Sequence, residues 1–209
     1  MDFVAPIDFI DLSQYRKAKI DFDYEAQQLQ IALDASKKEN DIQRYIKDNQ
    51  KWFIPGSLLR DYDFGHHDAY LVPEQPLGAE YRADYMLLGS NSIGYHIVLV
   101  EFEDVNIEYK LTSENAETLS VRKGLTQIRD WKRWMDNNRD YFLDSCGLSD
   151  IRKAIPSWGV HYCLVVSRRT YMNDVANQMR GQMQAETPRL HIVTYDRLVD
   201  NTKKIANGF

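Results

Sequence analysis

The first quarter of the chain places apolar residues at the spacing of a helix. Two stretches, residues 24–36 and residues 39–49, repeat apolar side chains every three or four positions, which puts these side chains on one helix face. The repeating residues are Leu29, Leu33, Ile42, Tyr45 and Ile46. The pattern predicts two amphipathic helices, preceded by an arm to about Asp23 that packs either on the domain or on a partner.

From about residue 68 the pattern changes to short apolar runs bounded by turn-forming residues, which is typical of strands. The runs cover residues 69–74, 81–88, 95–103, 160–166 and 190–195. Pro76 to Gly78 are expected to end the first run, and residues 89–94 to form a turn. The run at 95–103 has the strongest strand pattern in the chain.

A long helical pattern separates the third and fourth strands. Between about Thr118 and Leu143 the apolar residues form a single stripe. These residues are Val121, Leu125, Ile128, Trp131 and Met135. A further helix is predicted at residues 171–184, and a short helix closes the chain. This order predicts a single α/β domain at residues 39–209, with helices on both faces of a mixed sheet and with residues 1–38 as an N-terminal arm and helix.

The second and third strands are expected to form a hairpin whose register follows from its turn. With the turn at residues 91–94, the register places Asp84 opposite Glu101. It also places Arg82 opposite Glu103. Two opposed carboxylates have Cβ atoms about 4.5–5.5 Å apart, which costs free energy unless a cation lies between them. The pair therefore predicts a site for Mg²⁺, which binds one or two carboxylates together with phosphate oxygens and activates water.

The same residues admit an interpretation without a metal. Arg82 would neutralise Glu103, and both Asp84 and Glu101 would be solvated at the end of the sheet. A one-residue slip of the register would also separate the acidic pair. The pattern alone leaves both interpretations open.

The composition excludes several classes of protein. The 209 residues carry a net charge of −5, so contact with nucleic acid requires a local basic patch. Two cysteines exclude a disulfide scaffold and a four-cysteine zinc site. The chain lacks an apolar run of the roughly 18 residues that a membrane span needs and lacks a secretory leader pattern, so a cytoplasmic location is expected. It has no glycine-rich phosphate loop, so no nucleotide cofactor is expected.

The acidic residues of the hairpin carry a resemblance to a known family. An Asp on one strand followed by E/D-x-K on the next is the signature of the PD-(D/E)xK nuclease superfamily, and here Asp84 is followed by Glu101-Phe102-Glu103. More narrowly, residues 39–198 resemble the nuclease domain of the Shedu anti-phage defence family. The segments that carry this resemblance are ENDIQRYIKDNQKWF, YRADYMLL, IVLVEFE, KGLTQIRDWKRW and LHIVTYDRL.

The resemblance implies a metal-dependent DNA endonuclease that forms a homo-oligomer. Asp84, Glu101 and the carbonyl of Phe102 match the family's ligands of Mg²⁺ or Mn²⁺. Glu39 matches an auxiliary acid on the preceding helix. Gln127 matches a helix glutamine that reaches toward the site in many members.

One position departs from the family pattern, because Glu103 replaces its lysine. Lysine normally orients the attacking water, so either Glu103 serves as a third acid or as a base, or the positive charge comes from elsewhere. Lys123 lies one helical turn before Gln127 and projects from the same flank, which makes it the first candidate, and Arg82 is the second. If neither reaches the metal, the domain is catalytically impaired and binds DNA or a protein partner.

Basic residues gather on the long helix and after one strand. They are Arg122, Lys123, Arg129, Lys132, Arg133, Arg168 and Arg169. Such a group either contacts phosphates or forms a solvated helix face, and beside a nuclease site we favour phosphate contact. His96, His161 and His191 lie inside predicted strands, and we interpret them as packed or hydrogen-bonded residues.

Overall fold

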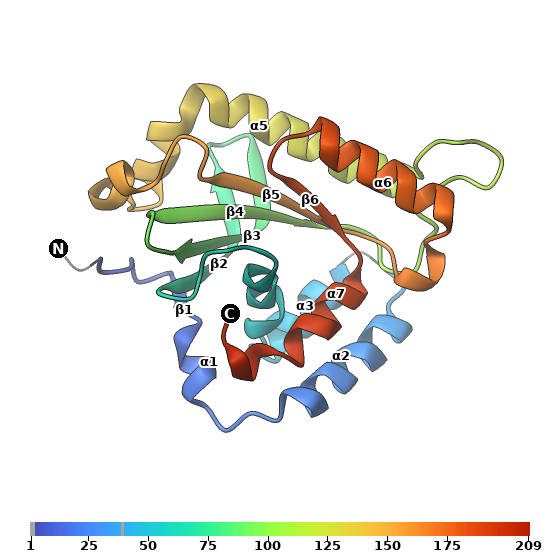
Figure 1. The fold of residues 1–209 in the computed structure, drawn as a ribbon, viewed down its shortest axis with the longest axis horizontal. Helices are drawn as coiled ribbons and strands as arrows, with labels where there is room; N and C mark the ends of the chain where they lie inside the picture. Colours follow the sequence, from blue (N-terminus) through green and yellow to red (C-terminus); the bar gives the residue numbers. More distant parts are fainter. Residues whose placement is uncertain (1–2, 39) are drawn as a thin grey trace.

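A six-stranded mixed sheet forms the centre of the computed structural model, which describes residues 3–38 and 40–209 (Figure 1). Its strands, in spatial as well as chain order, are β1 (Ile10–Asp11), β2 (Ala69–Leu77), β3 (Tyr81–Ser90), β4 (Tyr95–Phe102), β5 (Val160–Val165) and β6 (Leu190–Val193). The first four strands are antiparallel, whereas β4, β5 and β6 are parallel. The predicted α/β class with a mixed sheet is confirmed.

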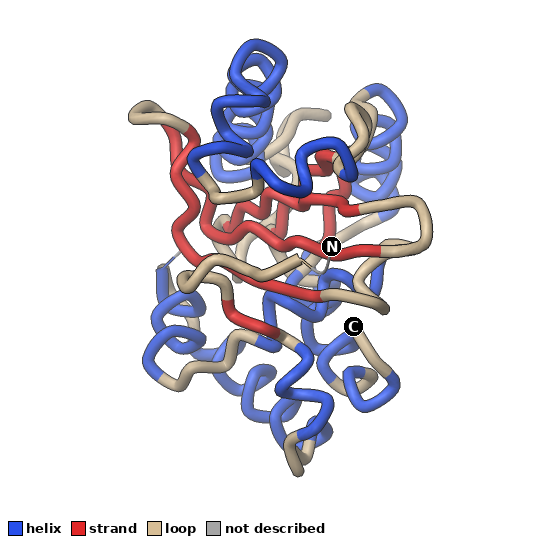
Figure 2. The backbone as a smooth tube through the Cα atoms, turned by 90° about the vertical axis from the view of Figure 1, so that its left-hand side faces the viewer, coloured by secondary structure: helices blue, strands red, loops and turns tan. Residues whose placement is uncertain are grey.

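Helices cover both faces of this sheet (Figures 1 and 2). The α-helices are α1 (Ser13–Lys17), α2 (Phe22–Ala35), α3 (Asn40–Asp48), α4 (Phe53–Gly56), α5 (Leu119–Ser145), α6 (Asp174–Glu186) and α7 (Tyr195–Thr202). Short 3-10 helices lie at η1 (Ser57–Asp61), η2 (Ser149–Ala154), η3 (Arg169–Tyr171) and η4 (Ile205–Asn207). Helices α5 and α6 pack on one face, and α2, α3, α4 and α7 pack on the other. None of these helices combines the length and the apolar character that crossing a membrane requires.

The apolar stripe of α5 fixes that helix against the sheet. All five predicted members of the stripe are buried, with Val121 and Trp131 fully inaccessible. They pack against strand residues such as Leu99 and Leu164. Each such side chain contributes about 1.5–3 kcal/mol when it is fully buried, so the stripe determines both the rotation of α5 and the direction in which its polar residues point.

The first long strand differs from the prediction at a proline. We expected Pro76 to end the strand, but β2 continues through Pro76 to Leu77. Beyond Leu71 the structure pairs β2 with β3 alone, because β1 pairs with Tyr70 and Leu71. A proline is tolerated on such an open strand edge, where the missing N–H group has no ladder partner to lose.

The N-terminal arm packs on the domain itself, which was one of the two predicted alternatives. Strand β1 extends the sheet beside β2. Leu12 is fully buried and Phe9 is 8% exposed. The arm therefore belongs to the same hydrophobic cores as the sheet that it borders.

Histidines on three neighbouring strands, β4, β5 and β6, form a cluster with the aromatic rings of Tyr62 and Phe64. His96 stacks on Phe64, His191 stacks on Tyr62, and His161 Nε2 lies 3.4 Å from His96 Nδ1. These contacts confirm the interpretation of the histidines as packed residues. Burial lowers the pKa of His161 to about 4, and the charges of the neighbouring histidines act in the same direction.

We expect this cluster to make the protein less stable in mild acid. The unfolded state binds a proton near pH 6.5, whereas His161 in the folded state does so only near pH 4, so unfolding is favoured progressively as the pH falls through that window. At pH 5 the loss is about 1 kcal/mol after allowance for the partial exposure of the ring. Urea unfolding at pH 7.5 and pH 5 measures it. The difference should shrink in His161→Gln and persist in His66→Gln, an exposed control; an equal difference in both variants would contradict this account.

Candidate functional site

The acidic residues of the hairpin lie where β3 and β4 separate. The pairs run from Ser90–Tyr95 to Tyr85–Val100, which is the predicted register, and the regular ladder ends there. One residue further, the backbone N–H of Phe102 donates a 2.7 Å hydrogen bond to Asp84 Oδ2. A carboxylate thus takes over the role of a strand carbonyl, and it holds Asp84 beside the Glu101–Phe102 peptide.

The two glutamates on either side of Phe102 are both withdrawn from solvent. Glu101 is 3% exposed and Glu103 is fully buried. The backbone of Glu103 is held from two sides, because its N–H donates to Val165 O at 2.9 Å and its carbonyl accepts from the Tyr195 hydroxyl at 2.7 Å. Strand β5 and helix α7 therefore fix the end of β4.

The first two turns of α5 approach Glu103 closely. Ser120 Oγ donates to Glu103 Oε2 at 3.1 Å, and Lys123 Nζ lies 3.4 Å from the same carboxylate. Gly124 permits this approach, because a Cβ atom there would lie 2.9 Å from Glu103 Cγ and 2.5 Å from Leu164 Cδ1. The N-terminal end of a helix also stabilises a nearby negative charge.

The structure distinguishes the two candidate replacements for the family's lysine. Lys123 forms an ion pair with Glu103, and its side chain remains 51% exposed. Arg82 instead lies 4.0 Å from Glu74 on the neighbouring strand and is 65% exposed. The predicted placement of Arg82 opposite Glu103 is thus replaced by an Arg82–Glu74 pair, and the cation next to Glu103 comes from α5.

Two hollows border this part of the molecule, one at Asp84 and one at Lys123. One, of about 770 Å³, is lined by Lys123, Gln127 and Arg122 of α5 together with Arg82. The other, of about 400 Å³, is lined by Asp84 and by α3 residues that include Asn40. The predicted auxiliary acid Glu39 lies outside the described residues, so its role stays a prediction.

The donor set suits a hard dication. Within residues 3–38 and 40–209, His, Cys, Asp and Glu side chains form no group of three or more that would hold a metal ion by themselves. Mg²⁺ does not need such a group, because it usually keeps several waters and binds to one or two carboxylates plus phosphate oxygens. The carboxylates of Asp84 and Glu101, with the carbonyl of Phe102, fit that requirement.

The predicted basic residues divide into exposed and structural ones. Arg122, Arg129 and Arg133 are exposed and recur at intervals of seven and four on α5, which places them on one stripe. Lys132 is half-buried, and its ammonium lies 5.9 Å from the centre of the Tyr162 ring.

Arg168 is a correction to the predicted phosphate contacts, because its side chain is buried. It is 5% exposed and forms ion pairs with Asp34 of α2 and Asp196 of α7. It joins these two helices and does not offer its charge to a ligand. Its neighbour Arg169 is exposed and pairs with Asp200.

Three residues that position the site were not singled out from the sequence. Ser120 and Gly124 act on the Glu103 side chain from α5, and Tyr195 holds the Glu103 carbonyl. Gly124 carried a signal, since a glycine inside a long helical pattern costs about 1 kcal/mol relative to alanine and usually has a packing reason. The serine and the tyrosine carried none.

We expect Gly124→Ala to destabilise the protein although alanine is the better helix former. The new methyl group would press on Leu164 and Glu103, and such overpacking costs about 1–3 kcal/mol. Gly181→Ala in α6 is the matched control, because a Cβ atom there meets nothing within 4 Å, and it should gain about 1 kcal/mol. Urea unfolding of both variants measures the difference, and a stabilised Gly124→Ala would show that α5 does not press on Glu103.

A comparison with known protein families matches most of the chain. The model of the family described as "Shedu protein SduA, C-terminal" matches residues 36–199. This range includes the hairpin, α5 and both parallel strands that follow. A comparison with curated proteins found no match.

Proposed function

The chain belongs to the Shedu SduA C-terminal family, which implies a role in anti-phage defence, and we propose that it serves there as a metal-dependent endonuclease that hydrolyses phosphodiester bonds of DNA. One observation carries this proposal. The Phe102 N–H group holds the Asp84 carboxylate next to the peptide of Glu101, at the end of a buried sheet, where Asp84 lines the smaller of the two hollows. The fold and this placement suit the PD-(D/E)xK superfamily.

In this proposal three groups of the hairpin hold the metal. Asp84 and Glu101 supply carboxylate oxygens, Phe102 supplies its carbonyl, and Glu39 is the auxiliary acid. A bound Mg²⁺ or Mn²⁺ would lower the pKa of a coordinated water and neutralise charge on the phosphodiester. The Asp84 carboxylate is oriented before any metal binds, because one of its oxygens already accepts the Phe102 N–H. Such preorganisation is what a catalytic centre requires.

Glu103 and Lys123 together replace the lysine of the family pattern. The Lys123 ammonium lies 3.4 Å from the buried Glu103 carboxylate. The side chain of Lys123 is still partly exposed, and it lines the same hollow as Gln127. In this proposal the Lys123 ammonium contacts either the attacking water or a phosphate oxygen. Gln127, one helical turn further along α5, orients the same water.

The exposed stripe of α5 gives DNA a surface to follow. Arg122 lines the same hollow as Lys123, and Arg129 and Arg133 continue from it along the helix. Contacts of this kind hold the phosphate backbone without reading sequence, and their strength falls as salt rises. Because the chain has a net charge of −5, DNA binding needs a local basic surface of this kind.

A rival function is a catalytically impaired domain that binds DNA or a protein partner. Its specific support is that Lys123 already pairs with the Glu103 carboxylate, so that neither charge is fully available for chemistry. Metal binding separates the two functions, because the rival does not require it.

We expect Asp84→Asn to abolish cleavage while the fold is retained. The asparagine carbonyl oxygen can still accept the Phe102 N–H, but the variant loses the negative charge that binds Mg²⁺. Titration calorimetry should show metal binding weakened by at least about tenfold, and cleavage of plasmid DNA should fall by two or more orders of magnitude, which is about 3 kcal/mol. Asp150→Asn, on the exposed part of η2, is the control.

The same experiment decides between the two functions. A wild-type protein that binds DNA but neither binds Mg²⁺ or Mn²⁺ nor cuts supercoiled, linear or single-stranded DNA would establish the rival. Cleavage by Asp84→Asn at the wild-type rate would remove Asp84 from the metal site.

Substitutions in the Lys123–Glu103 ion pair test the proposed role of Lys123 in cleavage. Lys123→Ala should lower the rate of cleavage by about a hundredfold without changing Mg²⁺ affinity, whereas Arg82→Ala should change it little. The double variant Glu103→Lys/Lys123→Glu restores the family's lysine position, and it should cut faster than either single substitution. Equal losses in Lys123→Ala and Arg82→Ala, or a double variant no better than the singles, would contradict the assignment.

A further inference from the structure

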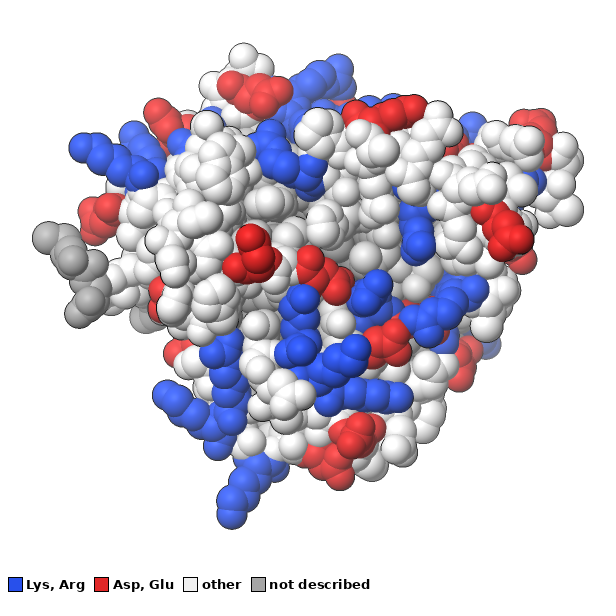
Figure 3. Space-filling model, viewed as in Figure 1, with Lys and Arg blue, Asp and Glu red and all other residues white. Residues whose placement is uncertain are grey.

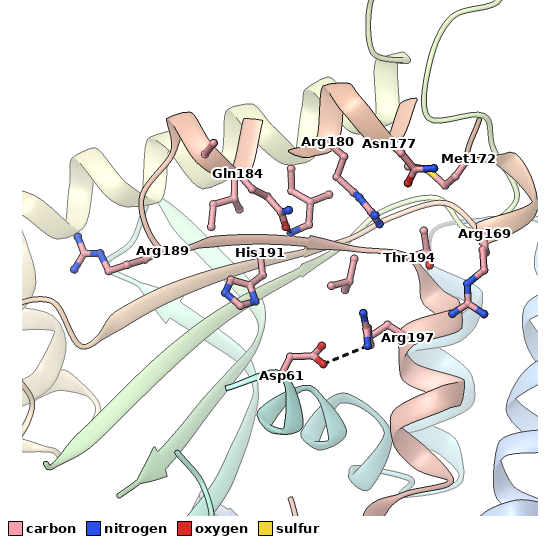
Figure 4. Close-up of a pocket in the computed structure, with 14 residues that line it drawn as sticks. Asp61, Arg169, Met172, Asn177, Arg180, Gln184, Arg189, His191, Thr194 and Arg197 are labelled. Carbon is pink, nitrogen blue, oxygen red and sulfur yellow. Dashed lines mark hydrogen bonds and ion pairs between the residues drawn. The ribbon is translucent and has the colours of Figure 1, made fainter. Parts of the chain in front are cut away.

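A third hollow, a cleft, lies along the outer edge of β6, away from the acidic hairpin. It has a volume of about 920 Å³, and α6, β6, α7 and Asp61 of η1 form its walls (Figure 4). This volume is in the upper part of the range of about 300–1,000 Å³ that is usual for ligand sites. The residues that line it do not include any of those proposed to act in cleavage.

The lining of this cleft is strongly positive in a negatively charged protein. Four arginines face one aspartate, Asp61, while the whole chain has a net charge of −5. The arginines are Arg169, Arg180, Arg189 and Arg197, after which we name this hollow the arginine cleft. Figure 3 shows basic side chains gathered on the face between α6 and α7. Asp200 pairs with Arg169 and Asp61 pairs with Arg197, so within the described residues the excess positive charge comes from Arg180 and Arg189. Like charges gathered in this way cost free energy, and a negatively charged ligand would offset that cost.

Two of these arginines reach toward each other from opposite walls. Arg180 descends from α6 and Arg197 rises from α7 (Figure 4). Arg197 lies 3.8 Å from Asp61, whereas the described residues place no carboxylate within ion-pair distance of Arg180. Burial lowers the pKa of Arg180, and the nearby charge of Arg197 lowers it further.

The outer edge of β6 does not offer free N–H groups at Ile192 and Leu190 to an added strand. The outward N–H of Ile192 donates a 2.6 Å hydrogen bond to Gln184 Oε1 of α6, and the N–H of Leu190 donates to Thr187 O. A peptide that added to the sheet would have to break the first of these bonds. The cleft is therefore built for a compact ligand that the arginine side chains recognise.

We propose that this cleft binds a phosphate group, held between the guanidinium groups of Arg180 and Arg197 with Arg169 at the side. Guanidinium groups match phosphate oxygens in charge and in geometry. The apolar floor formed by Leu190, Ile192 and Met172 has room for an attached organic group such as a nucleoside. The phosphate comes either from a free nucleotide or from a nucleic-acid strand, and the site does not depend on the proposed nuclease activity.

Titration of the full chain with pyrophosphate, in EDTA and at low salt, tests the shared chemistry. Binding should weaken by about tenfold or more in Arg180→Gln and in Arg197→Gln. Arg152→Gln is the matched control, since Arg152 also forms one ion pair with an aspartate, Asp144, outside the cleft. The Arg152→Gln variant should bind pyrophosphate with the affinity of the wild type. Asp84→Asn should also bind like the wild type, which separates this cleft from the metal site.

Two further titrations identify the source of the phosphate. Tighter binding of ATP than of pyrophosphate indicates a nucleotide, and tighter binding of a 5′-phosphorylated oligonucleotide than of its unphosphorylated twin indicates the end of a strand. Thermal unfolding verifies that each variant is folded. Arg180→Gln should unfold like the wild type, because among the described residues the Arg180 side chain has no ion pair to lose. The proposal is overturned if the wild type binds none of the three probes, or if both cleft variants bind them as well as Arg152→Gln does.

Discussion

The hydrogen bond from the Phe102 N–H to the Asp84 carboxylate is the contact on which the acidic site depends. It forms at the point where the β3–β4 ladder ends, and it keeps the two strands together for one more residue. A backbone carbonyl at that position would have given the same bond without a charge. Because a carboxylate gives it, the end of the hairpin combines structural closure with a negative group held beside the Glu101–Phe102 peptide. The remaining oxygen of Asp84 has a direction fixed by the sheet and does not depend on a flexible loop.

Glu103 poses the opposite problem, since a fully buried carboxylate is costly unless it is paired and hydrogen-bonded. Two residues of α5 offset this cost: the Ser120 hydroxyl donates a hydrogen bond to the carboxylate, and the Lys123 ammonium forms an ion pair with it. Both contacts require α5 to lie close to β4, and Gly124 is the residue that permits it. The glutamate after the strand is therefore linked by direct contacts to the lysine in the helix and to the glycine next to that lysine. These three positions have to be understood as one unit.

The sheet, the long helix and the hairpin register could be predicted because they follow from periodic apolar patterns. The stripe that contains Leu125 and Ile128 admits only one buried face, and the turn at residues 91–94 determines the pairs up to Tyr85–Val100. The strand through Pro76 was missed because its open edge is a property of the sheet order, which no local pattern contains.

Two adjacent arginines show that the local sequence also does not determine the role of a single side chain. Arg168 and Arg169 are neighbours in the sequence, yet the first is 5% exposed between Asp34 and Asp196, and the second faces the arginine cleft. Their difference depends on where α2 and α7 lie, and Asp34 is 134 positions away from its partner. The same reasoning applies to Arg180 and Arg197, whose meeting across the cleft follows from the packing of α6 and α7 on opposite faces of the sheet edge.

Helix α7 connects the two sites of the molecule. Its first residue, Tyr195, is fully buried and donates its hydroxyl to the Glu103 carbonyl, while Arg197 in the same turn lines the arginine cleft. Residues within one turn of a tightly packed helix move together, because packed interiors deform little. The packing of α7 therefore positions both Arg197 in the arginine cleft and the backbone of Glu103.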